Sequence, residues 1–279
     1  MNPKQGQQNS QDSPQTRNAV RMNDIHHVIA VLSGKGGVGK SLVSSLLAVA
    51  LRQQRHQVGI LDADITGPSI PKMFFPHPAR PTSEPGGMVP VESRTGIKVM
   101  SINLLLEQED QAVIWRGPLI GKAIQQFWEE VLWGRLDYLI VDLPPGTSDA
   151  SLTVMQSLSL SGAVLVTAPP ALAGMVVKKA AQMAVQLQVP ILGLVENMSY
   201  FVCPDTGKKY EIFGPSHAEE TASGMHVPFL GRLPIDPQIA ALCEAGRIED
   251  YPAEAFGPIA KAIVDSAPMA RPPAPRRTS

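Results

Sequence analysis

Apolar residues occur along the chain in two kinds of run. Short, uninterrupted runs are typical of strands buried on both faces of a parallel sheet, whereas longer runs with polar residues at helical spacing indicate amphipathic helices. The strand-like runs cover residues 27–33, 57–63, 97–102, 137–143, 162–168, 190–197 and 228–233, and the helix-like runs cover 40–54, 117–133, 148–160, 171–187, 236–245 and 253–266. This alternation predicts an α/β fold with a doubly wound, mostly parallel sheet.

The two ends of the chain lack this pattern. Residues 1–24 are rich in Gln, Asn, Ser and Pro, and residues 267–279 hold four prolines and three arginines. Segments with so few apolar residues cannot bury enough surface to fold. We therefore predict one domain at residues 25–266 between a disordered polar tail and a Pro/Arg-rich tail. Residues 75–96, which are rich in Pro, Gly and Ser, are expected to form a loop.

The composition excludes several classes of protein. The net charge of the 279 residues is −1, which gives no electrostatic basis for binding nucleic acid. The two cysteines, Cys203 and Cys243, give no disulfide framework. The N-terminus lacks the apolar segment of a signal peptide, and the apolar runs are too short to span a bilayer. We expect a cytoplasmic protein with no nucleic-acid or membrane partner.

A glycine-rich segment joins the first predicted strand to the first predicted helix. It consists of Gly34-Lys35-Gly36-Gly37-Val38-Gly39-Lys40-Ser41 and fits the phosphate-binding pattern G-x-x-x-x-G-K-[ST]. Glycines let the backbone N–H groups surround a phosphate, and the start of a helix adds partial positive charge. In this loop Lys40 is expected to reach the β- and γ-phosphates of a nucleoside triphosphate, and the Ser41 hydroxyl to bind Mg²⁺.

The same glycines also fit a rival pattern. Three of them satisfy G-x-G-x-x-G, the fingerprint of a dinucleotide site, and Asp62 ends the next strand where a ribose-binding acid belongs. A dinucleotide site needs neither a phosphate-binding lysine nor a hydroxyl for magnesium. Lys40 and Ser41 therefore favour a nucleoside triphosphate over the cofactor of a nicotinamide-dependent dehydrogenase.

Acidic side chains follow two of the predicted strands. Asp62 and Asp64 end the second strand, where Asp62 suits a magnesium-bound water and Asp64 the orientation of an attacking water. Turn chemistry is the alternative for this pair, because aspartate is common in turns. Asp142 ends the apolar strand 137–143, as the acid of a Walker B motif does. Gly146 follows in a stiff Pro-Pro-Gly turn that could sense the γ-phosphate.

Two later segments could bind the base of the nucleotide. Asn197 ends another strand, and its carboxamide offers the donor and the acceptor that the adenine edge requires. The segment 231–236, which contains Pro234 and Asp236, could close over the base. Asp236 fits equally well as the cap of the helix that follows it.

Lys35 is a second lysine in a loop whose phosphates Lys40 already serves. The pattern G-K-G-G-x-G-K-[ST] resembles the deviant Walker A loop of the MinD, ParA and nitrogenase iron protein group of P-loop NTPases. This resemblance implies that Lys35 crosses a dimer interface to the nucleotide of the partner subunit, as an arginine finger does. It therefore implies a homodimer in which Lys35, Lys40 and Asp64 are catalytic.

Further segments match the motifs of one family. They lie at residues 33–41, 62–71, 115–118, 142–149 and 196–199, and the match extends over residues 26–266. Through them the chain resembles the Mrp/ApbC family of P-loop ATPases, which is implicated in carrying iron–sulfur clusters. The resemblance implies slow Mg²⁺-dependent hydrolysis of ATP, a nucleotide-sandwich homodimer, a [4Fe–4S] cluster that bridges two subunits, and acceptor apoproteins as partners.

Cys203 marks a departure from that family. Its members usually carry Cys-Pro-x-Cys at this point, whereas this chain has Cys203-Pro204-Asp205-Thr206. A [4Fe–4S] cluster normally takes four thiolates, and two subunits of this chain would supply two. Either two Cys203 thiolates share a labile cluster, or Cys203 binds no metal and the chain is a ParA- or MinD-like switch that binds another protein client.

The two cysteines are expected to lie in different surroundings. Gly207 and the following Lys208-Lys209 predict a hairpin turn beside Cys203, and the lysines are expected to lower the pKa of its thiol. Cys243 lies on a predicted helix among apolar neighbours, so we expect it in the core.

Overall fold

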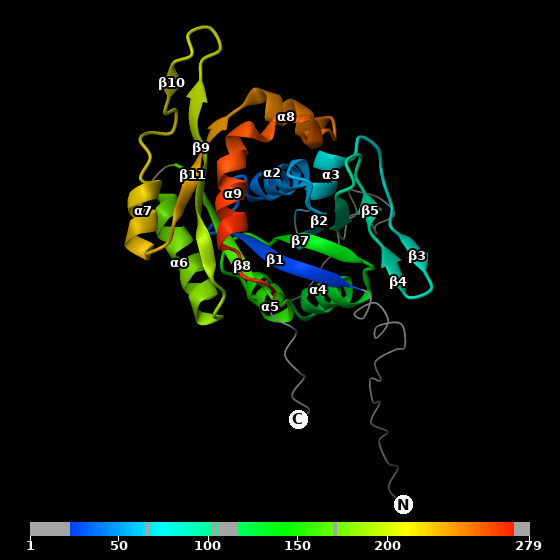
Figure 1. The fold of residues 1–279 in the computed structure, drawn as a ribbon. Helices are drawn as coiled ribbons and strands as arrows, with labels where there is room; N and C mark the ends of the chain where they lie inside the picture. Colours follow the sequence, from blue (N-terminus) through cyan, green and yellow to red (C-terminus); the bar gives the residue numbers. More distant parts are fainter. Residues whose placement is uncertain are drawn as a thin grey trace, which may run out of the picture.

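The computed structural model describes residues 23–64, 67, 69–101, 104, 117–169 and 172–270. Within these residues one large sheet forms the centre of the domain, with helices on both faces (Figure 1). Its strand order is β10-β9-β8-β1-β7-β2-β6-β5, and β11 also pairs with β9. These strands are β1 (Asp24–Ser33), β2 (Val58–Asp62), β5 (Val91–Glu92), β6 (Lys98–Ser101), β7 (Arg135–Asp142), β8 (Gly162–Thr167), β9 (Ile191–Val202), β10 (Lys209–Tyr210) and β11 (Phe229–Ile235).

Most strand pairs in the large sheet are parallel. β1 pairs in parallel with β7 on one side and with β8 on the other. β2 pairs in parallel with β6 and β7, and β9 pairs in parallel with β8 and β11. The short strands β5 and β10 are antiparallel to their neighbours. The prediction of a mostly parallel sheet is confirmed.

Helices cover both faces of the sheet. They are α2 (Lys40–Gln53), α3 (Ile70–Phe74), α4 (Gly117–Glu130), α5 (Asp149–Ser157), α6 (Leu172–Gln186), α7 (Ala218–Met225), α8 (Pro237–Glu244) and α9 (Gly257–Ser266). Val28, Ala30 and Leu32 of β1 belong to a buried cluster with residues of α4, α5, α6 and α7. Ile29 and Val31 belong to a second cluster, with residues of α2, α8 and α9. Because alternate residues of β1 serve both clusters, the domain is doubly wound as predicted.

The segment 75–96, which was predicted as a loop, contains short strands. β3 (Thr82–Glu84) and β4 (Gly87–Val89) form a separate antiparallel hairpin, and β5 joins the large sheet. A Cβ atom on Gly87 would lie 2.2 Å from the carbonyl oxygen of Glu130, so glycine lets this hairpin approach α4. The loop prediction is wrong, because strands of two or three residues are too short to show a two-residue period.

Other short elements were also missed. The sequence pattern predicts no helix at α3 or α7 and no strand at β10. It also predicts that the strand containing Asn197 ends at that residue, whereas β9 runs to Val202. The remaining predicted strands and helices are present, with bounds that differ by a few residues. These differences do not affect β1, β2 and β7, which lead into the phosphate loop and carry Asp62 and Asp142.

Both ends of the described chain are bonded to the domain. The Asn23 side chain donates a hydrogen bond to the Val131 carbonyl oxygen and accepts one from the Gly134 amide. At the other end, the Ala270 amide donates to the His26 carbonyl oxygen at 2.7 Å. The rest of the two predicted tails lies outside the described residues. None of the described helices is long and apolar enough to cross a membrane.

Candidate functional site

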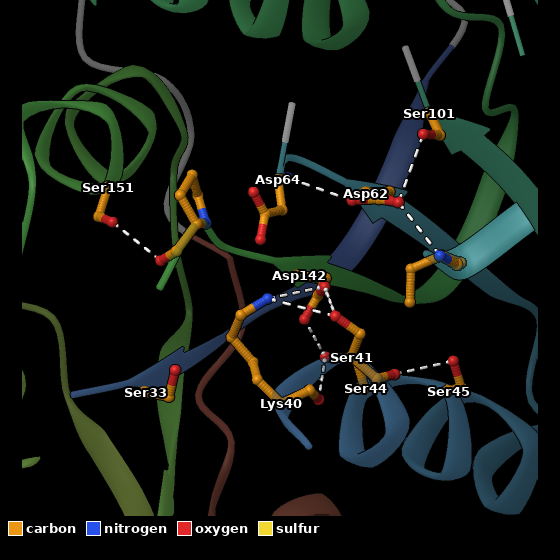
Figure 2. Close-up of polar contacts among 12 residues, drawn as sticks. Ser33, Lys40, Ser41, Ser44, Ser45, Asp62, Asp64, Ser101, Asp142 and Ser151 are labelled. Carbon is orange, nitrogen blue, oxygen red and sulfur yellow. Dashed lines mark hydrogen bonds and ion pairs between the residues drawn. The ribbon is translucent and has the colours of Figure 1, made fainter. Parts of the chain in front are cut away.

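The predicted site residues come together because their strands are neighbours in the sheet. β7 lies between β1 and β2, and all three run parallel, so their carboxyl ends meet at one edge. Asp62 of β2 lies opposite Asp142 of β7 in the register. The glycine-rich loop leaves β1 at the same edge, and Figure 2 shows Lys40 and Ser41 directed toward Asp142.

The loop between β1 and α2 needs its glycines. Gly37 and Gly39 both have left-handed backbone conformations with φ of 78°. A Cβ atom on Gly34 would lie 2.4 Å from the backbone of Val176 in α6, and one on Gly39 would lie 2.1 Å from Nδ2 of Asn197. The loop is therefore held tightly between two other elements at the start of α2, where the helix N-terminus favours an anion.

Lys40, Ser41 and Asp142 are in direct contact. The Lys40 ammonium lies 2.8 Å from Oδ2 of Asp142, and the Ser41 hydroxyl donates to the same oxygen at 2.6 Å. The Lys40 side chain is 6% exposed and that of Asp142 is fully buried. The acid predicted from the Walker B pattern therefore lies beside the predicted phosphate lysine and magnesium hydroxyl (Figure 2).

Ser44 is a site residue that the sequence analysis missed. Its buried Oγ lies 2.7 Å from Oδ1 of Asp142 and 3.1 Å from the carbonyl oxygen of Lys40. Ser44 follows Lys40 by four residues on α2, so the two positions lie on the same side of the helix. This spacing after the phosphate lysine is the signal that could have identified it.

Asp62 is fully buried at the end of β2. Its carboxylate accepts hydrogen bonds from the amides of Asp64 at 3.1 Å and Ile70 at 3.2 Å, and from the Ser101 hydroxyl at 3.3 Å. Burial, followed by the nearby Asp142 carboxylate, raises the pKa of Asp62 to about 8 and outweighs the groups that lower it.

The chemistry of these side chains fits a magnesium ion. Mg²⁺ prefers oxygen ligands, taken from one or two carboxylates together with water and substrate phosphates. Ser41, Asp62 and Asp142 present such oxygens at the end of the phosphate loop. After burial, the Asp142 carboxylate is the next cause that raises the pKa of Asp62, so the two acids repel each other when both are ionised. A divalent cation would offset this repulsion.

Asp64 and the turn that contains Gly146 border the loop. Asp64 is nearly buried just after β2, and Figure 2 shows its carboxylate turned toward the side on which Lys40 lies. The Gly146 amide donates to the carbonyl oxygen of Ser33 at 2.9 Å. This turn therefore lies against the start of the loop, and its role as a sensor of the γ-phosphate stays a prediction.

Asn197 contacts the loop itself. Its side chain is 2% exposed, and Nδ2 donates to the carbonyl oxygen of Val38 at 3.0 Å. The sequence analysis missed this contact because it joins residues far apart in the chain. The bond fixes β9 against the loop, and the contact of Asn197 with adenine stays a prediction.

Asp236 caps α8. Its carboxylate accepts from the Gln238 amide at 2.8 Å and from the Tyr251 hydroxyl at 2.9 Å. Burial, and then these interactions with Asp236, raise the pKa of Tyr251 to about 12. Of the two roles expected for Asp236, the cap is confirmed. Pro234 precedes it in β11, and closure of this segment over the base stays a prediction.

Lys35 lies exposed on the loop. Its carbonyl oxygen accepts a hydrogen bond from the Ser33 hydroxyl at 3.0 Å, which fixes the backbone beneath the side chain. Its ammonium forms no ion pair with any residue that the structure describes. Reaching the nucleotide of a partner subunit stays a prediction for this side chain.

Comparison with known proteins agrees with the geometry of this site. The family model described as "ParA: NUBPL iron-transfer P-loop NTPase" matches residues 24–267. The chain belongs to this family. An iron–sulfur cluster carrier protein from Methanocaldococcus jannaschii is 46% identical over 249 residues, which cover 88% of this chain and 86% of that protein. The cytosolic Fe-S cluster assembly factor NUBP2 from Bos taurus is 43% identical over 255 residues, which cover 88% and 94%.

Solved structures share the fold of this iron-transfer P-loop NTPase. A nucleotide-binding protein from Archaeoglobus fulgidus, in complex with ADP, is 44% identical with a TM-score of 0.77, covering 87% of this chain and 94% of that one. The cell division ATPase MinD from Pyrococcus furiosus shares the fold at 21% identity with a TM-score of 0.60, covering 86% and 99%. The resemblances to the cluster carriers and to the MinD and ParA group are confirmed.

In this iron-transfer P-loop NTPase, Cys203 lies in the turn between β9 and β10. The Cys203 amide donates to the carbonyl oxygen of Lys208 at 3.0 Å, and the Gly207 amide donates to that of Cys203 at 2.8 Å. The predicted hairpin is confirmed, and Figure 1 shows it projecting beyond the body of the domain. Cys203 is therefore accessible at a place separate from the strand-end acids.

The pKa of the Cys203 thiol is lowered, but the cause differs from the predicted one. The Thr206 hydroxyl contributes most, followed by the amides of Thr206 and Asp205. The attribution to the neighbouring lysines is wrong, because their ammonium groups lie over tyrosine rings instead. Thr206, which stands where the family usually has a second cysteine, therefore stabilises the thiolate of Cys203.

Cys243 is half-buried on α8 and packs against the cluster that contains α2 and α9. Burial raises the pKa of its thiol. It lies at the edge of the core that was expected to contain it. Among the described residues, no group of three or more His, Cys, Asp or Glu side chains is arranged to hold a metal ion. Cys203 alone would need further ligands from outside this chain to hold iron.

Proposed function

We propose that this chain is an ATP-binding iron–sulfur cluster carrier that hydrolyses ATP slowly as a nucleotide-sandwich homodimer. The observation that carries the proposal is the direct contact of Lys40, Ser41 and Asp142 at the start of α2. A buried lysine, a hydroxyl and a carboxylate beside a glycine-rich loop are the parts that bind the phosphates of a nucleoside triphosphate together with magnesium. The relatives named above supply the cargo of the proposed reaction.

The loop residues 34–41 would bind ATP as a unit. Their amides would hold the phosphates, and Lys40 would leave Asp142 to neutralise the β- and γ-phosphates. Ser41, Asp62 and Asp142 would hold Mg²⁺, which supplies positive charge to the triphosphate when bound. Burial of this region excludes bulk water, so each of these charges would act strongly.

The adenine would lie near the segments that follow β9 and β11. Asn197 is held beside the loop by its bond to Val38, and its side-chain oxygen would accept a hydrogen bond from the base. Pro234 and Asp236 would border the other side of the base. The cap that Asp236 provides to α8 would keep this segment in place.

Hydrolysis needs groups that act on the reacting phosphate. Asp64 would orient the attacking water, and the Gly146 turn, bonded to Ser33 beside the loop, would sense the γ-phosphate. Lys35 would come from the partner subunit and stabilise the charge that develops as the bond to the γ-phosphate breaks. A site completed only in the dimer would keep hydrolysis slow.

The cluster would be the cargo, held by two Cys203 thiolates from two subunits. A [4Fe–4S] cluster normally has four thiolate ligands, so two would leave it weakly held. The lowered pKa of Cys203 supports this role, because the thiolate is the form that binds metal. Release to acceptor apoproteins in the cytoplasm would follow, without a nucleic-acid or membrane partner.

A second candidate function is a ParA- or MinD-like switch that binds a protein client and carries no cluster. Thr206 favours it, because this residue replaces the second cysteine of the family motif. The names of the relatives favour the carrier. Both candidates share the nucleotide site and differ in what Cys203 does.

Calorimetry tests the nucleotide site. Lys40→Ala should abolish ATP binding in the presence of Mg²⁺, because the phosphates lose their buried cation. Lys35→Ala is the matched control, since it removes an exposed lysine from the same loop and should leave the affinity of a single subunit close to that of the wild type. A wild-type protein without affinity for ATP would contradict the proposal.

Anaerobic reconstitution with iron and sulfide separates the two candidates. Wild type should bind more iron than Cys203→Ala, as measured by absorbance and iron content. Thr206→Cys should hold its cluster longer against a chelator, because the dimer then offers four thiolates. Equal iron content in wild type and Cys203→Ala would reject the carrier and leave the switch.

A further inference from the structure

Strand β9 is interrupted at Met198. This residue has φ of 54°, a left-handed conformation that is uncommon for any residue other than glycine. In the pairing with β11, residues 197–199 lie between the paired positions Glu196 and Tyr200, whereas β11 has only Leu233 between their partners. Such a bulge disrupts the ladder and bends the strand, so the two parts of β9 differ in direction.

The inner part of β9, residues 191–197, is tied to the phosphate loop. Asn197 at its end donates to the carbonyl oxygen of Val38 at 3.0 Å and is almost completely buried. A Cβ atom on Gly39 would collide with the same carboxamide, so the loop and Asn197 fit closely. Any change in the shape of the loop on binding phosphates would therefore act on the inner part of β9.

The outer part of β9, residues 199–202, leads into the hairpin that carries Cys203. This hairpin returns through β10, which pairs with β9 at Lys209 and Tyr210 alone. Figure 1 shows it projecting from the rest of the domain. A hairpin with so short a ladder takes its position from whatever else holds its base.

Arg232 of β11 joins the two parts of β9 to the far side of the hairpin. Its Nε lies 2.5 Å from the Ser199 hydroxyl and 3.5 Å from Oε2 of Glu196, and its Nη2 pairs with the carboxylate of Glu211, which follows β10. Glu196 and Ser199 are buried and bonded to each other. The guanidinium therefore spans the bulge, with one end on buried groups and the other on the exposed base of the hairpin.

We propose that Arg232 is a positioning residue that couples the phosphate loop to the Cys203 hairpin. A shift of the phosphate loop would move the inner part of β9 through the bond of Asn197 to Val38. Arg232 would then move with Glu196 and displace Glu211 at the base of the hairpin. The nucleotide state would thus set the exposure of the Cys203 thiol. This inference rests on the proposed binding of ATP, and it assigns a role to charged groups that touch neither the nucleotide nor the thiol.

The test measures the alkylation rate of Cys203 with and without a non-hydrolysable ATP analogue and Mg²⁺. A Cys243→Ala background leaves one thiol, and light scattering selects a protein concentration at which nucleotide does not change the oligomeric state. We expect the analogue to change the rate by about fivefold or more, the lower end of typical coupling between sites. The readout is the ratio of the two rates, so direct effects of a substitution on the thiol cancel.

Glu211→Gln removes the negative charge that holds the outer link and leaves the buried pair of Arg232 and Glu196 intact, so this variant should fold. Its rate ratio should fall toward one while its affinity for the analogue stays close to that of the parent. Arg232→Lys keeps a positive charge beside Glu196 but cannot span the bulge, so it should also lose the ratio. Lys209→Met is the matched control. It removes a cation of the hairpin that lies over Tyr200 and takes no part in the link to Glu211, so the ratio of alkylation rates should be unchanged.

Two results would overturn the coupling. One is a rate that does not respond to the analogue although calorimetry shows it bound, and the other is an unchanged ratio in Glu211→Gln and Arg232→Lys. A parent protein that binds no analogue at all is a different outcome, because it rejects the proposed nucleotide site and the coupling together.

Discussion

Ser44 holds one oxygen of Asp142 while Lys40 and Ser41 hold the other. We predict that Ser44→Ala lowers the free energy of unfolding by about 1–3 kcal/mol, because a buried carboxylate oxygen loses its partner. Ser45→Ala is the control, since that hydroxyl bonds only to the helix backbone and to a methionine sulfur among the described residues. Urea unfolding measures both variants, and equal losses would show that the bond to Asp142 has no special weight.

The pKa values of the two thiols should differ from that of an ordinary cysteine in opposite directions. The lowered pKa of Cys203 gives it more thiolate at a given pH, and the raised pKa of Cys243 gives it less. Labelling with iodoacetamide, followed by mass spectrometry, should therefore reach its maximal rate at a lower pH for Cys203. Thr206→Val should move the Cys203 profile toward higher pH, because the hydroxyl that contributes most to the shift is lost.

Thr206→Ser is the control for that experiment, since it keeps the hydroxyl and should keep the profile. An unchanged profile in Thr206→Val would show that the backbone amides of the turn are sufficient to lower the pKa. Because the fold lowers this pKa, the thiolate adds stability above the pKa of an unfolded cysteine, and that contribution is lost as the pH falls through the lowered pKa.

Single residues were predictable where chemistry fixes their spacing. Lys40, Ser41 and Asp142 were found because a phosphate loop and a strand-end acid have recognisable patterns, and the structure brings them into contact. The bond from Asn197 to Val38 joins distant segments and leaves no local pattern. Ser44 has a local signal, its four-residue spacing from Lys40, but its contact with Asp142 depends on the placement of β7. The lowered pKa of Cys203 comes from the Thr206 hydroxyl and the amides of its turn, which depend on the turn geometry and not on the neighbouring charges.

At the scale of elements, burial decided what could be predicted. β1, β2 and β7 are buried over most of their length, so each appears in the sequence as an uninterrupted apolar run. β3 and β4 are short and lie at the surface, and α3 spans residues 70–74 only, so none of them shows a period. The extension of β9 was missed because the bulge at Met198 breaks the alternation between its two parts.

The packing of the phosphate loop against α6 gives a prediction for two glycines. Gly34→Ala should destabilise the protein by about 1–3 kcal/mol, because its Cβ would lie 2.4 Å from backbone atoms of Val176 that cannot move aside. Gly36→Ala is the matched control, since the nearest atom to its Cβ is a Pro145 side-chain carbon at 4.0 Å. Thermal unfolding should separate the two, and similar losses would mean that α6 yields to the added methyl group.

At the scale of the whole molecule, two features that a single chain leaves exposed support a dimer. Lys35 has no ion-pair partner among the described residues. The hairpin and the segment after it expose large apolar side chains, namely Val202, Tyr210, Ile212 and Phe213. Apolar side chains gathered on one projecting segment are typical of a surface that another protein covers. In a dimer that covers both Lys35 and this apolar segment, Lys35 would reach the nucleotide of the partner subunit, and the two Cys203 side chains would lie near each other.

Complementation between two inactive variants tests whether Lys35 acts in the partner's site. Lys35→Ala and Asp64→Ala should each lose ATP hydrolysis as homodimers. In a mixed dimer, the site that keeps Asp64 receives Lys35 from the other subunit, so one of two sites is complete. Random mixing of equal amounts should therefore restore about a quarter of the wild-type rate, since half of the symmetric pairs are mixed.

The control for this experiment mixes Lys35→Ala with the double variant Lys35→Ala/Asp64→Ala. No subunit in that mixture carries Lys35, so no site can be completed and no activity should return. Recovery in the first mixture alone would require a lysine that crosses between subunits, because neither variant has a complete site by itself. If verified mixed dimers of the first kind stay inactive, Lys35 acts within its own subunit, and the exposed position of its side chain needs another explanation.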